Sequence, residues 1–273
     1  MTNIYGTIGF SLLEHIDDKN KIMILADMHN TLPSCNNKTN IADWFKSKFP
    51  TSEILLEEVP REDFKLKELW TESEHTQQLK NLYLDNPKII NPLDIRPFLI
   101  PFSWEVMDNN DPDYKIPLMK YLKGINRFFC LKDPYLMKKL SNYALEKIED
   151  THHGNHFLKL KKQFYKYIKE CKDILEKDMY YVRMHHMNIL EGVNDILNAI
   201  MEWFICAKIE QKKHRPIIMH AGLFHSDSVI RWLTKLYKYK IIKEQGINSM
   251  KASEMNKING CINIDPNINA LFG

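Results

Sequence analysis

The sequence lacks any apolar run long enough to cross a membrane. A transmembrane helix needs roughly 18 consecutive apolar residues, and no segment of the 273-residue chain approaches that length. The first twenty residues, MTNIYGTIGFSLLEHIDDKN, contain no basic stretch followed by a long apolar core, so we expect no signal peptide. These absences predict a soluble, intracellular protein in the cytoplasm with no membrane partner.

Paired cysteine motifs are also missing. The chain has five cysteines, an odd number, and no C-x-x-C spacing; they are Cys35, Cys130, Cys171, Cys206 and Cys261. This usage argues against a disulfide framework and against a cysteine zinc site, and it favours a reducing compartment.

A strong charge of either sign is absent as well. The formal net charge is +3 and the sequence pI is about 8.4, whereas nucleic-acid-binding domains carry a pronounced basic patch. We therefore expect no nucleic-acid partner. The 44% of hydrophobic residues, with 11% aromatic residues, is enough for a large core.

Short apolar runs alternate with helical patterns near both ends of the chain. Strands are expected at 21–27, 52–58, 87–97, 216–219, 238–243 and 261–264, and helices at 41–49, 66–84 and after Ser226 or Asp227 as the N-cap. Alternation of this kind predicts an α/β fold with a largely parallel central sheet flanked by helices.

The middle of the chain has almost no strand signal. Apolar residues recur at spacings of three and four over 157–175, which predicts a helix, and a second long helix is expected over 177–207. Gly154-Asn155-His156 is expected in a loop between helices. We predict a single α/β domain over residues 1–273. Its long all-helical insertion, residues 105–212, would form one wall or lid of the site.

Polar residues stand where four of the expected strands end. They are Asp27 and His29, Glu57, Asp94 and Arg96, and His220 and His225. Ligands bind at the carboxyl ends of parallel strands, so these side chains are expected on one rim. Histidine and carboxylate together either hold a divalent metal that activates water, or act without metal, with histidine as a general base that the carboxylate orients.

Structural interpretations of the same residues remain open at this point. His29 could cap a loop, and Glu57 could pair with a surface lysine. Asp94 and Arg96 could form a local ion pair. His220 could be a buried core histidine with its own partners. For His225 a functional role is favoured, because histidine is not a preferred N-cap.

The order of these motifs resembles one superfamily, which groups erythromycin-esterase-like proteins, ChaN-like haem-uptake lipoproteins, TraB/PrgY proteins and Tiki proteases. Its members have an early strand ending in G-x-x-H, a strand ending in Glu, and a late G-x-x-H that opens a helix. The matching segments here are Ala26-Asp27-Met28-His29, Leu56-Glu57-Glu58 and Gly222-Leu223-Phe224-His225. Ala26 replaces the usual glycine, and Asp27 stands where glutamate is common.

Two further segments resemble the erythromycin-esterase branch: NPLDIR, which contains Asp94 and Arg96, and Arg183-x-x-x-Met187. The resemblance covers about residues 20–97 and 178–246. It implies a hydrolase of ester or amide/peptide bonds, with a small-molecule or peptide substrate. Because the branches differ, with metal-dependent peptide cleavage, ester hydrolysis and haem binding among them, it implies no particular substrate and no oligomeric state.

The resemblance also implies roles for individual residues. His29 and His225 would act as general base or, with Glu57, as ligands of one divalent metal such as Zn, Mn or Co. Asp27 would support His29. Arg183 would stabilise an oxyanion, and Asp94, Arg96 and His220 would contact the substrate.

Two alternative functions stay open. ADMHNT resembles the first Asp-x-His of metallophosphoesterases, and Gly154-Asn155-His156 resembles their later Gly-Asn-His, although their G-D-x-x-D-x-G segment is missing. The other alternative is a catalytically degenerate member of the superfamily that binds a ligand or partner, because the glycine of the early motif is lost.

Overall fold

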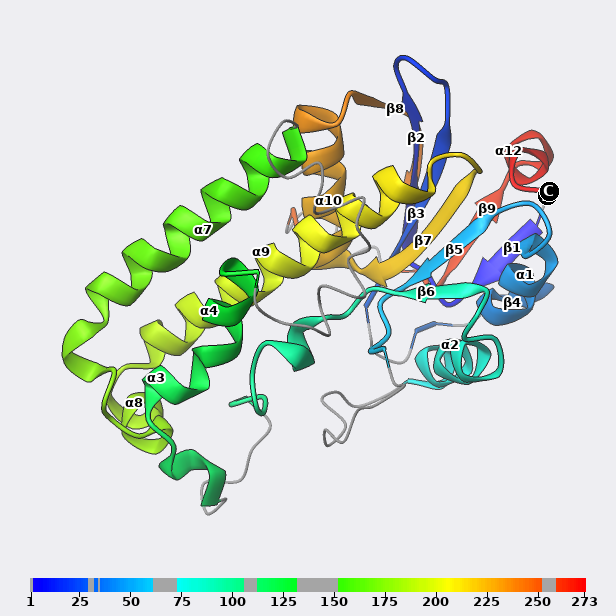
Figure 1. Cartoon of the computed structure of the whole chain (residues 1–273). Coiled ribbons are helices and arrows are strands. Elements are labelled where there is room, and N and C mark those ends of the chain that lie inside the picture. The colour runs from blue at the N-terminus through cyan, green and yellow to red at the C-terminus, as the bar shows by residue number, and fades with distance from the viewer. Residues whose placement is uncertain are drawn as a thin grey trace. The chain divides into compact units, whose positions relative to one another are not determined.

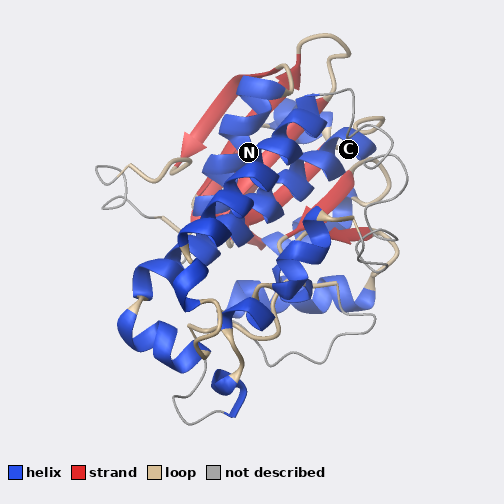
Figure 2. Ribbon diagram, turned by 60° about the vertical axis from the view of Figure 1, so that its left-hand side comes forward, coloured by secondary structure: helices blue, strands red, loops and turns tan. Residues whose placement is uncertain are grey.

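The computed structural model describes residues 2–28, 32–33, 35–60, 73–105, 112–131, 152–251 and 259–273. The chain divides into two compact units. Unit 1 comprises Met1–Val59, Thr71–Leu93 and Lys208–Gly273, and unit 2 comprises Pro60–Trp70 and Asp94–Ala207. Every strand of the described residues, red in Figure 2, belongs to unit 1.

Unit 1 is built on a six-stranded sheet. The strand order is β6-β5-β7-β3-β2-β8, with bounds Ile90–Pro92, Glu53–Leu56, Ile217–Gly222, Lys21–Asp27, Gly9–His15 and Tyr239–Gly246 (Figure 1). The four strands β6, β5, β7 and β3 are parallel, and β2 is antiparallel to both β3 and β8. The predicted α/β fold with a largely parallel sheet is confirmed.

The central strands are buried because their sequences are almost entirely apolar. Residues of β7 are all buried, and in β3 only Lys21 retains appreciable exposure. Such strands suit a sheet covered on both faces. The predicted third strand is shorter than expected: β6 ends at Pro92, and Arg96–Phe98 forms the 3-10 turn η1.

A second, three-stranded sheet in unit 1 was not predicted. Its order is β4-β1-β9, formed by Lys38–Asn40, Thr2–Tyr5 and Cys261–Ile264, and only β9 matches a predicted strand. The segments TNIY and KTN are too short and too polar to stand out in the sequence. They form strands because β1 pairs with partners from both ends of the chain, in parallel with β4 and antiparallel with β9.

The expected absence of disulfides was wrong. Cys35 and Cys261 are bonded to each other across a separation of 226 residues. No local spacing could reveal this pair, since it depends on the three-stranded sheet. Cys261 begins β9 and lies opposite Tyr5 of β1, and the Tyr5 hydroxyl donates to the Leu32 carbonyl, close to Cys35. The bond also removes the cysteine argument for a reducing compartment.

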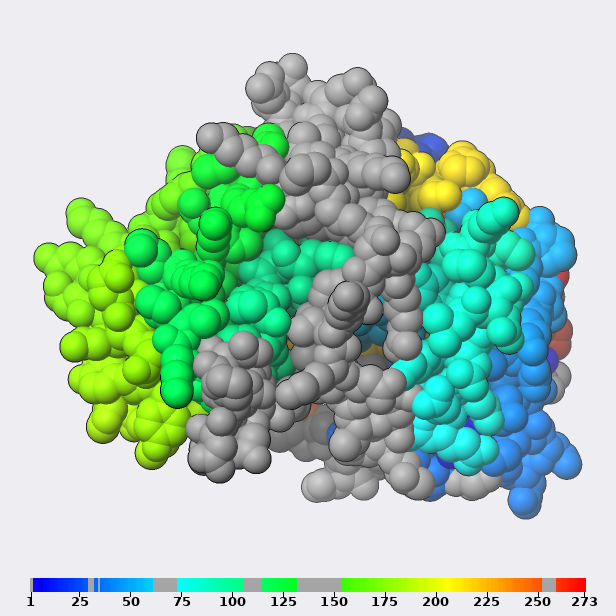
Figure 3. Space-filling model, turned by 60° about the horizontal axis from the view of Figure 1, so that its bottom comes forward, coloured from blue at the N-terminus to red at the C-terminus, as the bar shows by residue number. Residues whose placement is uncertain are grey.

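The described residues of unit 1 also form the helices α1 (Ile41–Lys48), α2 (Glu74–Asp85), α10 (Leu223–Leu236) and α12 (Pro266–Leu271), and the last turn of α9 (Met187–Lys212). In α2 the buried residues include His75, Leu79 and Leu82, which recur at helical spacing and therefore share one face. The opposite face is exposed and contributes to the cyan surface in Figure 3. The predicted N-cap of α10 was wrong: Gly222 is the N-cap, and the helix begins at Leu223.

Unit 2 is helical in its described residues. Its helices are α3 (Leu118–Tyr121), α4 (Lys123–Phe129), α7 (His152–Glu170), α8 (Met179–His185) and the part of α9 (Met187–Lys212) up to Ala207. The predicted second long helix is thus broken at His186, and Gly154–His156 lies inside α7 and not in a loop. The core of unit 2 contains packed aromatic side chains: Phe128, Phe157 and Trp203 are in mutual ring contact.

No helix among the described residues is long and apolar enough to cross a membrane.

His156 predicts a pH dependence of stability in unit 2. The residue is only 2% exposed, and burial, aided by the charge of Lys159, lowers its pKa to about 4. Because the folded pKa lies below the unfolded value of about 6.5, the unfolded chain takes up the proton first as pH falls. The stabilisation is therefore complete above about pH 6.5 and is lost as pH falls towards 4, by about 3 kcal/mol.

Urea unfolding of wild type and His156→Phe at about pH 7.5 and about pH 4.5 measures this contribution. The difference between the two pH values should shrink in His156→Phe by about 3 kcal/mol. The matched control is His185→Phe, because His185 is an exposed histidine of the same unit. If the unfolding free energy of His156→Phe changed with pH as much as that of wild type, the buried neutral imidazole of His156 would not be the cause of the pH dependence.

Candidate functional site

The candidate site lies at the carboxyl ends of β3, β5 and β7 in unit 1. These strands are parallel neighbours, with Asp27 opposite Gly222 and Leu56 opposite His220. Their ends therefore coincide at one edge of the sheet, which is where α/β proteins bind ligands. Of the polar residues predicted at strand ends, Asp27, Glu57 and the start of α10 lie at this edge.

Glu57 is held against the N-terminus of α10. Its Oε2 accepts a hydrogen bond of 2.7 Å from the Gly222 backbone N–H, and Gly222 is the N-cap of that helix. The first backbone N–H groups of a helix have no partners inside it and carry partial positive charge, so a carboxylate is stabilised there. The Glu57 side chain is thereby fixed in position beside the N-terminus of α10.

His225 lies in the first turn of α10, beside the same carboxylate. Its Nε2 is 3.6 Å from Glu57 Oε1, and each of the two side chains is 8% exposed. When the imidazole is neutral, a carboxylate near Nε2 favours the tautomer with the proton on that nitrogen. Nδ1 is then the basic nitrogen, which is the form needed in a general base.

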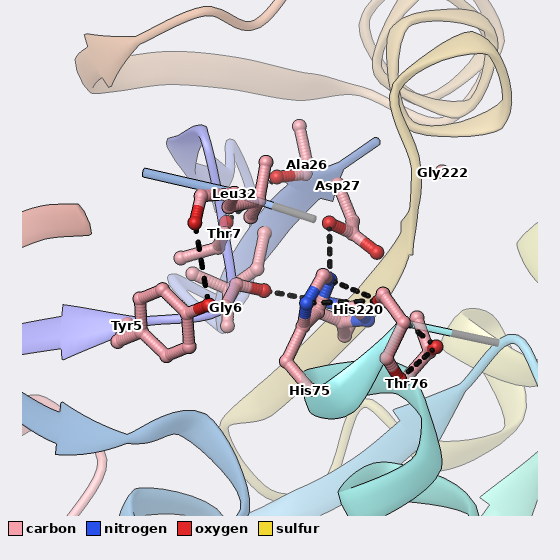
Figure 4. Close-up of polar contacts among 12 residues, drawn as sticks. Tyr5, Gly6, Thr7, Ala26, Asp27, Leu32, His75, Thr76, His220 and Gly222 are labelled. Carbon is pink, nitrogen blue, oxygen red and sulfur yellow. Dashed lines mark hydrogen bonds and ion pairs between the residues drawn. The ribbon is translucent and has the colours of Figure 1, made fainter. Parts of the chain in front are cut away.

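Asp27 forms a second histidine–carboxylate pair, with a partner that the sequence did not reveal. Asp27 Oδ1 is 2.8 Å from His75 Nε2, and the two side chains are almost fully buried (Figure 4). The sequence predicted that Asp27 would support His29, and the partner that the structure describes is His75 of α2. His75 stands in the polar segment TESEHTQQL, and its only signal is helical spacing with Leu79 and Leu82.

Gly6 lies next to two buried histidines, His75 and His220. Its carbonyl oxygen is 3.1 Å from His220 Nε2 (Figure 4). Its φ is +106°, which favours glycine, and a Cβ there would be 2.8 Å from Ile41 Cγ2 and 3.1 Å from His75 Cβ. The backbone of Gly6 therefore packs directly against His75. His220 is 3% exposed and anchors this connection between β1 and β2.

His29 lies outside the described residues, so its predicted role as base or metal ligand stays a prediction. The metal set of His29, Glu57 and His225 stays one for the same reason. Within the part of the chain that the structure describes, no group of three or more His, Cys, Asp or Glu side chains is arranged to hold a metal ion.

The other predicted substrate-binding residues belong to unit 2. Asp94 is buried and forms a bidentate pair with Arg96, at 2.9 Å from Nε and 3.0 Å from Nη2, and Arg96 Nη1 also donates to Asn198. The guanidinium of Arg183, in α8, donates to the Tyr114 hydroxyl. The structure describes these contacts within unit 2, so the predicted substrate-binding roles of Asp94, Arg96 and Arg183 stay predictions.

Comparisons with known proteins found no family model, no curated protein and no solved structure that matches the chain. The class of protein that the fold and site define is therefore an α/β protein with two histidine–carboxylate pairs at the edge of a largely parallel sheet.

Proposed function

We propose that the protein is a hydrolase of ester or amide/peptide bonds, related to the erythromycin-esterase-like superfamily. The observation that carries the proposal is the location of two histidine–carboxylate pairs, Glu57–His225 and Asp27–His75, at the carboxyl ends of adjacent parallel strands. In α/β enzymes the active site lies at this edge of the sheet. A histidine oriented by a carboxylate commonly acts as the general base in acyl transfer.

The Glu57–His225 pair supplies the proton transfer. Nδ1 of His225 removes a proton from water as the water oxygen attacks the substrate carbonyl carbon, and Glu57 stabilises the imidazolium that forms. The imidazolium then donates its proton to the leaving alkoxide or amine. The Gly222 N–H keeps the Glu57 carboxylate in place throughout, so little reorganisation accompanies the reaction.

A metal ion would supply activated water to such a site. The described residues alone do not form a three-ligand set, so each step above uses only groups of the chain. Elemental analysis of protein purified without a histidine tag, together with activity before and after chelation, decides whether the reaction needs a metal.

A substrate panel tests the proposed function. We expect turnover of p-nitrophenyl esters or of fluorogenic peptides, at a rate that falls at least tenfold in His225→Asn, because proton transfer by a positioned side chain contributes about 10²–10⁴-fold. No turnover of any ester or peptide, combined with thermal stabilisation by a ligand, would instead establish the degenerate binding protein.

Turnover restricted to p-nitrophenyl phosphate would instead identify a phosphoesterase. The structure offers that alternative no support at Gly154-Asn155-His156. This segment is helical, and the His156 side chain is buried within unit 2.

A further inference from the structure

Unit 2 contains a cavity of about 450 Å³ that lies outside the proposed hydrolase site. One wall is the segment Phe98–Phe102, and the other is formed by Ile116 and by the helices α3 and α4, which are labelled in Figure 1. All of its lining residues belong to unit 2. Pockets for small molecules have volumes of about 300–1,000 Å³, so the size of this cavity suits a small ligand.

The interior of the cavity is the open edge of the apolar core of unit 2. Phe98, Ile100 and Ile116 line it and pack against that core while remaining partly exposed. The buried Tyr121 also lines it, and its hydroxyl already donates a hydrogen bond of 2.8 Å to the Phe102 carbonyl. Burying a polar group against such side chains without a hydrogen bond is unfavourable. The interior therefore favours an apolar group.

The helical wall carries three cations, Lys120, Lys123 and Arg127. These positions are three and four residues apart, so the side chains share one face of the segment formed by α3 and α4. Among the described residues, no acidic side chain lines the cavity, and none of the three cations has a carboxylate partner. A ligand anion would therefore bind here without displacing an existing ion pair.

Gly124 brings the charged face of α4 next to the apolar wall. A Cβ at this position would be 2.3 Å from the Leu99 carbonyl oxygen and 3.1 Å from Leu99 Cα. Only glycine allows the backbone of α4 to approach the segment Phe98–Phe102 this closely. The cations and the apolar side chains therefore line one cavity, which offers a ligand both kinds of contact at once.

We propose that this cavity binds a small amphipathic anion, with its apolar body in the interior and a carboxylate or phosphate group beside Lys120, Lys123 and Arg127. The planar guanidinium of arginine can bind two oxygens of either group, and each lysine adds a point charge. The proposal goes beyond the hydrolase function and does not rest on it, because it uses only residues of unit 2 and requires no turnover.

Isothermal titration calorimetry of the full-length protein tests the site with 4-phenylbutyrate and phenyl phosphate, one probe for each type of anion. We expect one molecule of at least one probe to bind per chain, and to bind more weakly as ionic strength rises. The neutral counterparts, 4-phenylbutanamide and phenol, should bind at least about tenfold more weakly, because hydrogen bonds between charged groups contribute more than those of neutral groups.

Two kinds of variant locate the bound anion. Lys123→Gln/Arg127→Gln removes two of the three cations and should weaken its binding at least about tenfold. The matched control is Lys162→Gln/Lys169→Gln, which removes the same charge from exposed positions of α7 outside the cavity and should bind like wild type. Ile100→Trp fills the apolar interior without changing the charge and should abolish binding, with thermal unfolding as the check that the variant is folded.

Three results would overturn the proposal. The first is that neither anion binds, and the second is that the neutral counterparts bind as tightly as the anions. The third is that the anion binds equally well to wild type, to Lys123→Gln/Arg127→Gln and to folded Ile100→Trp, because the molecule would then bind elsewhere. An equal loss in the α7 control would also contradict a local site, since it would show an effect of overall positive charge.

Discussion

Replacing Glu57 with glutamine is expected to lower kcat/KM for the ester or peptide substrate at least a hundredfold. Glutamine has nearly the same shape, and its amide oxygen can still accept the hydrogen bond from Gly222. It carries no charge to stabilise the imidazolium of His225, whose Nε2 is 3.6 Å from Glu57 Oε1. Orienting and stabilising the base are central to proton transfer, which contributes about 10²–10⁴-fold in enzymes.

The matched control for this variant is Glu58→Gln. Glu58 is the next residue in the chain and is also partly buried, so the two variants remove the same charge from neighbouring positions. Glu58→Gln should retain the wild-type kcat/KM, and thermal unfolding should show that both variants are folded. If Glu57→Gln were as active as wild type, the Glu57–His225 pair would have no part in the reaction.

The parallel strands of the central sheet could be predicted because they are buried on both faces, whereas the antiparallel strand β2 (Gly9–His15) was not predicted. The segments around β3, β5 and β7 are continuous apolar runs, and their own residues determine that they are strands. The segments TNIY (β1) and KTN (β4) have no such run. Their pairing depends on partners far away in the sequence, which a local pattern cannot show.

The same distinction applies to the candidate site. Asp27, Glu57 and His225 could be predicted because each follows a recognisable strand, and parallel strands end at one edge. His75 lies in the first turn of a helix in a polar segment, and packing of α2 against Gly6 brings it to Asp27. Its contact with Asp27 follows from tertiary structure and not from a motif.

The disulfide is the clearest case in which tertiary structure decides, and breaking it should have the largest effect on stability. Cys35 and Cys261 are 226 residues apart in sequence. A cross-link over such a long loop restricts the unfolded chain, and the chain-entropy relation gives a stabilisation of about 5 kcal/mol. Chemical unfolding of wild type with and without a phosphine reductant, and of the Cys35→Ser/Cys261→Ser double variant, should show this loss.

Cys130→Ser is the matched control, because Cys130 is a free, exposed cysteine, and it should unfold like wild type in the absence of reductant. Stability that reduction leaves unchanged would show that β1 and β9 hold together without the cross-link. The bond is also connected to the site, because β1 leads into Gly6, which contacts His220 and His75. The reduced protein, assayed below its unfolding transition, should therefore also lose hydrolytic activity.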